Sequence, residues 1–204
     1  MAFGDSLTEG ESAGALRSLP AHNPGTPGIA TSYPARLYAL LTAHYPTQTL
    51  KVFNGGFGGE QVLQALPRFE EYLDEHNPQV VILMHGVNDL VNGTDIEEVI
   101  DGIERLIEAA KKRSMRVLLS TLPRQRPDGR RAVAAPLIVP FNAELKTLAS
   151  AVNVPVIDIY PHIPTTMLTP DGLHITAAGN QKLAELYFEA LRARYEQPAT
   201  AGLE

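Results

Sequence analysis

A serine, an asparagine and an Asp-x-x-His pair stand out because together they could transfer an acyl group. Ser6 lies near the N-terminus, Asn88 lies mid-chain, and Asp171 precedes His174 by three residues. A serine hydroxyl is a poor nucleophile until a base takes its proton, and His174 can serve as that base. Asp171 can accept a hydrogen bond from the other ring nitrogen and so fix the tautomer and orientation of the imidazole.

Acyl transfer also needs hydrogen-bond donors for the negative charge that develops on the attacked carbonyl oxygen. Three candidates are the backbone N–H of Ser6, a glycine N–H within residues 55–59, and the side-chain amide of Asn88. Each donor of this kind typically stabilises the transition state by roughly 3–4 kcal/mol. An asparagine amide suits the role because it is neutral and binds charge only as that charge appears.

Short apolar runs predict the strands that would carry these residues. The runs cover 50–53, 80–84, 116–120 and 154–158. The continuous apolar run at 80–84 is typical of a strand that is covered on both faces. Pro155 in the last run favours an edge strand, because proline cannot donate to a ladder.

Apolar residues at helical spacing predict helices between the strands. The clearest face runs from Ile96 to Ala110, and Thr94-x-x-Glu97 before it is typical of a capping box. Further apolar faces cover 37–41, 62–73 and 183–191. For the face at 37–41, Ser32 is the expected N-cap and Pro34 falls in the first turn.

Strands and helices therefore alternate, which predicts an α/β protein. We expect a three-layer α/β/α sandwich with a central, mostly parallel sheet of about five strands and right-handed crossovers. In such sheets the site lies beyond the carboxyl ends of the strands. The segments that begin at Gly4, Asn54 and His85 follow predicted strands, and Asp171–His174 precedes the last helix.

Four motifs in sequence order resemble those of the SGNH hydrolases, the GDSL family of esterases and lipases. They are Gly4-Asp5-Ser6-Leu7, Asn54-x-Gly56-x-x-Gly59, Gly86-x-Asn88-Asp89 and Asp171-x-x-His174. The resemblance spans residues 4–179, which is nearly the whole chain. One such motif would be weakly specific, whereas four in the family's order are strongly so. The resemblance implies the flavodoxin-like fold of that family.

The resemblance also implies a role for each matching residue. Ser6 corresponds to the nucleophile, His174 to the general base and Asp171 to the orienting acid. Ser6, Gly59 and Asn88 correspond to the three oxyanion donors, and Gly59 is chosen among the glycines by its offset from Asn54.

Residues beside these motifs are expected to complete the site. We assign His85, Val87 and Leu7 to substrate binding, with His85 at the rim of the pocket. We expect Asp5 and Asp89 to have structural roles as loop or helix caps. Two long loops, 19–31 and 123–140, are expected to border the pocket, and we interpret the arginines of the second loop as a solvated face.

Composition excludes several classes of protein. The chain has 204 residues and no cysteine, which excludes a disulfide scaffold, a thiol nucleophile and thiolate metal sites. The histidines show no metal-ligand spacing, so we predict no metal and no cofactor. The net charge is −6 and no basic patch occurs, which argues against nucleic acid as a partner. No apolar run reaches the roughly 18 residues of a membrane span.

The four motifs predict one catalytic domain over residues 1–195. We expect residues 196–204 to form a flexible tail, and Leu203-Glu204 is typical of a cloning remnant. The N-terminus has no signal-peptide pattern, so the sequence as written predicts a cytoplasmic protein. Only Met1–Phe3 precede the first motif, about five residues fewer than is usual in the family, which is often exported. An incomplete N-terminus and export therefore stay open, and the oligomeric state is not predicted.

The predicted function is hydrolysis of a small-molecule carboxylic ester through an acyl-enzyme on Ser6. Short- to medium-chain acyl esters are favoured, because so small a chain has no dedicated lid domain. Carbohydrate O-acetylesterase, thioesterase and lysophospholipase activities stay open as alternatives, although the absence of Trp disfavours a sugar-stacking rim. A non-catalytic binding module is disfavoured, because all four motifs are intact.

Overall fold

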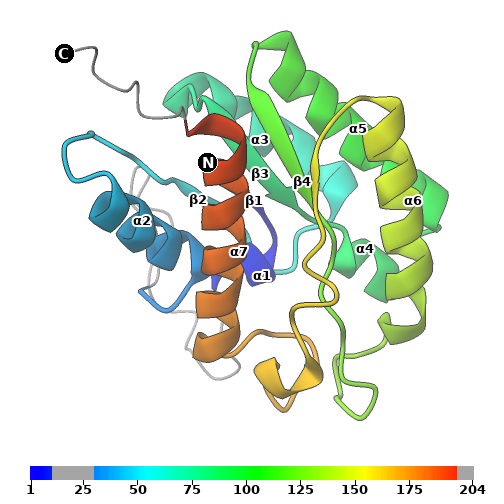
Figure 1. The fold of residues 1–204 in the computed structure, drawn as a ribbon. Coiled ribbons are helices and arrows are strands. Elements are labelled where there is room, and N and C mark those ends of the chain that lie inside the picture. The colour runs from blue at the N-terminus through cyan, green and yellow to red at the C-terminus, as the bar shows by residue number, and fades with distance from the viewer. Residues whose placement is uncertain (11–29, 197–204) are drawn as a thin grey trace, which may run out of the picture.

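A parallel sheet of five strands forms the centre of the computed structural model, which describes residues 1–10 and 30–196 (Figure 1). The strands are β1 (Ala2–Gly4), β2 (Asn54–Gly56), β3 (Val80–Met84), β4 (Arg116–Ser120) and β5 (Val156–Ile157). Their order across the sheet is β2-β1-β3-β4-β5, and every pair is parallel. This is the doubly wound order of flavodoxin-like folds. The predicted fold class is confirmed.

Helices cover both faces of this sheet. They are α1 (Ser6–Glu9), α2 (Tyr33–His44), α3 (Val62–His76), α4 (Val87–Val91), α5 (Ile96–Lys112), α6 (Ile138–Ala151) and α7 (Ala177–Tyr195). Two short 3₁₀ turns, Ala135–Leu137 and Thr165–Met167, complete the elements. Helices α2 and α7 pack together in one layer, while α3 packs on α5 and α5 on α6 in the other (Figure 1).

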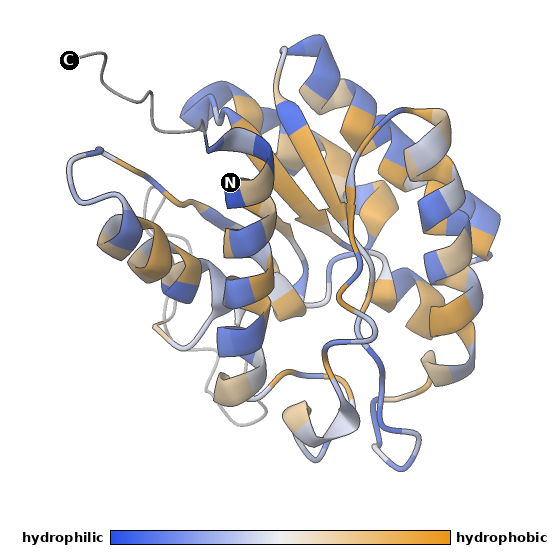
Figure 2. Ribbon diagram, in the orientation of Figure 1, coloured by the Kyte–Doolittle hydropathy of each residue, from blue (hydrophilic) through white to orange (hydrophobic). Residues whose placement is uncertain are grey.

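The core lies between the sheet and these two layers. Figure 2 shows apolar strands at the centre and helices whose polar residues face outward. Phe3 of β1 and Leu83 of β3 are completely buried, and Phe69 of α3 packs on Phe3 with ring centroids 4.5 Å apart. Burial of both sheet faces explains why the run at 80–84 is continuously apolar.

The second strand lies later in the sequence than its apolar run predicts. Residues 50–53 form no strand, and β2 is instead the glycine-rich Asn54–Gly56. Its extent is set by β1, with Ala2 opposite Asn54 and Gly4 opposite Gly56. Only tertiary pairing makes a strand of two glycines, because glycine weakens a strand by itself.

Two helix boundaries also differ from the sequence predictions. The capping box at Thr94 does not form, since α5 begins after Asp95 and no side chain caps it. The loop expected over 123–140 is shorter, because α6 already begins at Ile138 and Pro140 falls within its first turn, where proline is tolerated. Ser32 caps α2 as predicted.

Some predictions concern residues that lie outside the described part of the chain. Most of the loop expected over 19–31 falls within 11–29, and all but the first residue of the expected tail falls within 197–204.

The close approach of β2 to α1 generates a stability prediction. A Cβ on Gly56 would overlap the backbone of Glu9, which cannot move without displacing α1. We expect Gly56→Ala to lower the free energy of unfolding by about 3 kcal/mol, measured by urea denaturation. Gly93→Ala is the control, because a Cβ there meets nothing within 4 Å and only its positive φ of 82° costs stability, by about 1–2 kcal/mol. Equal destabilisation by the two changes would contradict the steric explanation.

Candidate active site

Three side chains distant in the sequence form one hydrogen-bonded chain at the carboxyl edge of the sheet. The Nε2 atom of His174 lies 3.1 Å from Oγ of Ser6, and its Nδ1 atom lies 2.6 Å from Oδ2 of Asp171. Ser6 and His174 are 168 positions apart. All three residues are at least 95% buried. The structure therefore brings together the three residues that the sequence assigned to nucleophile, base and acid.

Ser6 is presented by a tight turn from strand to helix. Strand β1 ends at Gly4, and α1 begins at Ser6 itself. Asp5 is the N-cap, and its Oδ1 accepts a hydrogen bond of 2.9 Å from the backbone N–H of Leu7. This capping bond confirms the structural role expected for Asp5 and fixes the backbone on both sides of the serine.

Asp171 is held as a carboxylate by converging donors. Its Oδ1 accepts from the Thr169 hydroxyl at 2.6 Å and from the backbone N–H groups of Leu173 and His174, each at 3.0 Å. Burial alone would raise the pKa of Asp171, but these bonds and the bond from His174 outweigh it and hold the pKa well below its ordinary value. Because an ionised carboxylate can only accept, Nδ1 of His174 carries a proton and the neutral ring leaves Nε2 as the acceptor for the Ser6 hydroxyl.

The loop after β4 supports the Asp171–His174 segment from outside. The backbone N–H of Arg131 donates to the Asp171 carbonyl at 2.8 Å, and the N–H of Arg126 donates to the Gly172 carbonyl at 2.9 Å. Gly172 has a φ of 86° and lies against the backbone of Gly129, where a Cβ would not fit. Sequence reasoning placed this loop at the pocket but missed its backbone contacts, because no side-chain pattern encodes them.

The Arg126 side chain makes a separate contact within the loop. It pairs with exposed Asp128, with its Nη2 atom 2.6 Å from Oδ2. Arg130 and Arg131 are exposed, as expected of a solvated face, but Arg124 is half-buried and its guanidinium lies 4.2 Å from the centroid of the Tyr160 ring, so the interpretation does not hold for all of the loop arginines.

The two remaining expected donors lie on segments that are bonded to each other. The Nδ2 atom of Asn88, on α4, donates to the backbone oxygen of Glu60 at 2.9 Å, and Glu60 directly follows Gly59. The turn is tied to β1 by the Phe57 N–H, which donates to the Gly4 carbonyl at 3.0 Å. Gly59 itself has a positive φ of 83°. The oxyanion roles of Gly59 and Asn88 stay predictions at this point.

The residues assigned to substrate binding lie in the interior. His85, Val87 and Leu7 are 2%, 1% and 2% exposed, so the structure places none of them at a rim. His85 bonds to the carboxylate of Glu60 instead of facing solvent. The reason is that all three come shortly after a buried strand end: His85 directly follows β3, and Leu7 and Val87 lie in the short helices α1 and α4 that follow β1 and β3. Asp89 has the structural role expected of it, because its carboxylate accepts from the backbone N–H of Val62 at the start of α3.

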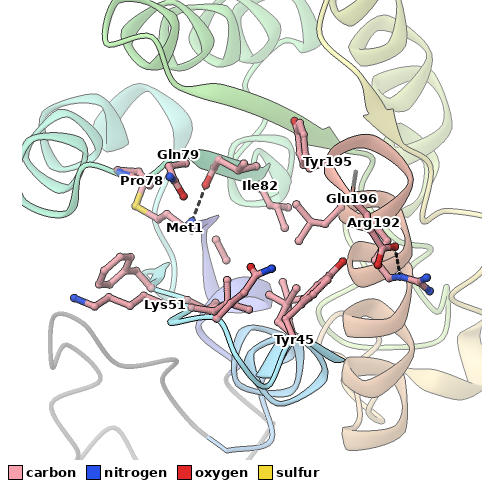
Figure 3. A pocket seen from close by; sticks show the side chains of 18 of the residues that line it. Met1, Tyr45, Lys51, Pro78, Gln79, Ile82, Arg192, Tyr195 and Glu196 are labelled. Atoms are coloured by element: carbon pink, nitrogen blue, oxygen red, sulfur yellow. Dashed lines mark hydrogen bonds and ion pairs between the residues drawn. The ribbon is translucent and has the colours of Figure 1, made fainter. Parts of the chain in front are cut away.

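A large hollow in the surface lies away from this site. It has a volume of about 1380 Å³ and is lined by residues at the amino ends of β1 and β3 and by the C-terminal end of α7. Figure 3 shows Met1, Lys51, Gln79 and Tyr195 around it. No triad residue lines it, so the hollow and the triad belong to opposite edges of the sheet.

The described ranges, 1–10 and 30–196, hold neither a metal-binding cluster nor a membrane-spanning helix. Within them no group of three His, Cys, Asp or Glu residues is placed to hold a metal ion. No helix in those ranges is both long and apolar enough to cross a bilayer.

The hydrogen bonds to Asp171 generate a prediction of pH-dependent stability. Because the pKa of Asp171 is lower in the folded protein, its ionised form stabilises the fold above roughly pH 4, and this contribution is lost as the pH falls towards the folded-state pKa. We expect Asp171→Asn to lower the free energy of unfolding by about 2 kcal/mol at pH 7, and the difference from wild type to shrink below pH 4. Urea denaturation across this range measures it, with exposed Asp101→Asn as the control. A difference that is constant or grows at low pH would contradict the assignment.

Two curated proteins are similar to parts of this chain. An acetylxylan esterase of Geobacillus stearothermophilus is 31% identical over 94 residues, which are 46% of this chain and 41% of that protein. An arylesterase of Vibrio mimicus is 28% identical over 91 residues, 45% of this chain and 44% of that protein. The matches thus span less than half the length of these relatives.

Solved structures share the fold over most of the chain. A crystal structure of an acetylxylan esterase from Geobacillus stearothermophilus aligns with a TM-score of 0.73 at 22% identity, covering 92% of this chain and 91% of that one. A GDSL-like lipase from Bacteroides thetaiotaomicron aligns with a TM-score of 0.69 at 21% identity, covering 94% and 86%. The model of the GDSL-like lipase/acylhydrolase family matches residues 2–182, and the chain therefore belongs to that family.

Proposed function

We propose that this protein is a serine esterase that hydrolyses carboxylic esters through an acyl-enzyme on Ser6. The observation that carries the proposal is the continuous chain of hydrogen bonds from Ser6 through His174 to Asp171, at 3.1 and 2.6 Å. This arrangement lets a neutral imidazole take the serine proton while a fixed carboxylate stabilises the imidazolium that results. Membership of a lipase and acylhydrolase family supports the same chemistry.

The proposed reaction proceeds in two displacements. Oγ of Ser6 attacks the ester carbonyl while its proton passes to Nε2 of His174, and the tetrahedral oxyanion accepts hydrogen bonds from the N–H groups of Ser6 and Gly59 and the Asn88 amide. The intermediate collapses as His174 returns the proton to the leaving alcohol. Water then attacks the acyl-enzyme, again giving its proton to His174. The second tetrahedral intermediate collapses as His174 returns that proton to Oγ of Ser6, and the acid departs. Asp171 stays ionised throughout.

Short acyl esters are the substrates we propose first. Exposed apolar side chains stand beside the site segments: Phe57 precedes Gly59 by two residues and is 44% exposed, and Val133 follows Arg131 by two and is 64% exposed. These side chains offer contact area for a small apolar group, because burying exposed apolar surface is favourable.

An acetylated carbohydrate is the second candidate substrate. The observation in its favour is the 31% identity to a protein named acetylxylan esterase. Both candidates use the same reaction, so they differ only in the alcohol that leaves.

One assay series tests the proposal and separates the substrates. We expect p-nitrophenyl acetate and butyrate to be hydrolysed faster than octanoate and palmitate, and Ser6→Ala to lower kcat by at least about 10³-fold. Ser150→Ala, on an exposed position of α6, is the control and should retain wild-type rates. Equal rates for wild type and Ser6→Ala would overturn the proposal. Faster turnover of acetylated xylan than of the acyl series would favour the carbohydrate substrate.

Asn88 provides a separate prediction for the oxyanion. We expect Asn88→Ala to lower kcat by about 10²- to 10³-fold with little change in KM, because the amide binds charge that exists only in the transition state. Steady-state kinetics on p-nitrophenyl acetate measures both constants. Asn92→Ala, just after α4, is the matched control and should leave kcat unchanged. A rise in KM with unchanged kcat would instead assign Asn88 to ground-state binding.

A further inference from the structure

A buried ionic cluster lies directly behind the expected oxyanion donors. Arg68 of α3 pairs with Glu60 through two bonds, Nε to Oε1 at 2.7 Å and Nη2 to Oε2 at 2.5 Å. His85 adds a third, with Nε2 lying 3.2 Å from Oε2 of Glu60. The side chains of Glu60, Arg68 and His85 are only 8%, 17% and 0% exposed. Burying charged side chains costs free energy, and pairing them often does no more than offset that cost. Stability alone therefore does not explain this cluster.

The proton on His85 can be placed from its neighbours. The backbone N–H of Gly86 points at Nδ1 of His85 at 3.0 Å, and an N–H can only donate. Nδ1 is therefore the acceptor, and in the neutral ring Nε2 carries the proton and donates to Glu60. All three bonds thus run towards one carboxylate, which receives donors from two different segments of the chain.

The cluster is bonded to both donor segments. Glu60 follows Gly59 in the turn, and its backbone oxygen accepts from Asn88 at 2.9 Å, which leaves the second N–H of that amide for a ligand. His85 lies three positions before Asn88, and its ring accepts from the N–H of Gly86 at the start of α4. Glu60 therefore contacts the Asn88 segment twice, once by its backbone and once by its carboxylate.

Arg68 anchors this arrangement to the sheet. Its Nη1 atom donates to the Gly55 carbonyl in β2 at 2.9 Å, and its guanidinium lies 4.3 Å from the centroid of the Phe3 ring in β1. Both contacts are with the strands that precede the site segments. Three different nitrogens of the planar guanidinium bind the two carboxylate oxygens and the carbonyl at once, a geometry that the single nitrogen of a lysine does not reproduce.

We propose that the Arg68–Glu60–His85 cluster is a positioning unit that holds Gly59 and Asn88 in the geometry required to bind the oxyanion. The inference rests on the proposed esterase function and adds three positioning residues to it. None of the three touches the reacting atoms. They act through the turn and the amide, whose placement must be accurate to about 0.5 Å to be effective.

The test is a change that keeps the shape of Glu60 and removes its charge. Oε2 of Glu60 accepts from both Arg68 and His85, and Glu60→Gln replaces one carboxylate oxygen by an NH2 group that cannot accept. We expect the turn and the Asn88 amide to lose their fixed position. We expect kcat on p-nitrophenyl acetate to fall by about 10- to 100-fold with KM changed less than about threefold. A boronic acid that forms a tetrahedral adduct with Ser6 should lose affinity by a similar factor, because the adduct uses the same donors.

A double-mutant cycle distinguishes positioning from a general structural role. If Glu60 acts through Asn88, then Glu60→Gln should cost much less in the Asn88→Ala background than in wild type. The control is Asp74→Asn. Asp74 lies near the C-terminal end of α3, the helix that carries Arg68, and makes a two-bond pair at 2.6 and 3.0 Å with Arg113 at the end of α5. This substitution should leave kcat and the boronic acid affinity unchanged.

Each outcome decides between positioning and stability alone. Wild-type kcat in Glu60→Gln, or equal losses in both backgrounds of the cycle, would overturn the proposal. If Glu60→Gln fails to fold, Arg68→Lys replaces it, since it keeps the charge and removes the fork, and the same losses are expected. A wild-type protein without Ser6-dependent hydrolysis would mean that the esterase function itself has failed, whereas an active wild type with unaffected variants would reject only the cluster's role.

Discussion

The close contact of backbones at the carboxyl ends of β1, β2 and β3 is the constraint on which the site depends. A Cβ on Gly4 would overlap the Met84 carbonyl, and a Cβ on Gly56 would overlap the backbone of Glu9. Only glycine allows these approaches, and they bring three strand ends together within a very small volume. Each site segment follows its strand by only a few residues: Ser6 follows β1, the turn before Glu60 follows β2, and α4 follows β3. The positions of the strands therefore set the distances between these segments.

Electrostatics at the site follow from how each carboxylate is supplied with donors. Asp171 receives four hydrogen bonds, which hold its pKa well below the ordinary value despite burial. Asp5 has the single capping bond from Leu7, and its Oδ2 has no hydrogen-bond partner in the part of the chain that the structure describes, so burial raises its pKa. Two aspartates near one serine therefore differ in character: hydrogen bonds lower the pKa of Asp171, which accepts from an imidazole, whereas burial raises the pKa of Asp5, which caps α1.

Segments that contain none of Ser6, Asp171 and His174 hold the site segments in place. The loop after β4 holds the Asp171–His174 segment through backbone hydrogen bonds, and Glu60 bonds the turn to α4. Such contacts tolerate many side chains, which is consistent with a shared fold at 21–22% identity to the solved relatives. What must persist is the geometry of a few bonds, since function depends on the site and not on the fold as a whole.

The sequence by itself determined the α/β class and the sheet of about five strands, and it pointed to the three residues that the fold joins in one hydrogen-bonded chain. Buried strands such as Val80–Met84 and the apolar face of α5 are encoded by local periodicity, and Ser6, Asp171 and His174 by residue type and spacing. Prediction from the sequence was wrong where no local pattern exists. The glycines of β2 become a strand only because β1 pairs with them, and the start of α5 differs because the capping box did not form.

Only the tertiary structure decided which groups meet. The sequence placed His85 at a rim, whereas the fold buries it against Glu60, because the residue after β3 is enclosed on both sides of the sheet. The pairing of Arg68 with Glu60 and the contact of Gly129 with Gly172 join segments whose separation in sequence carries no signal. Hydrogen bonds and close packing depend on distances of a few ångströms, and those distances exist only once the chain has folded.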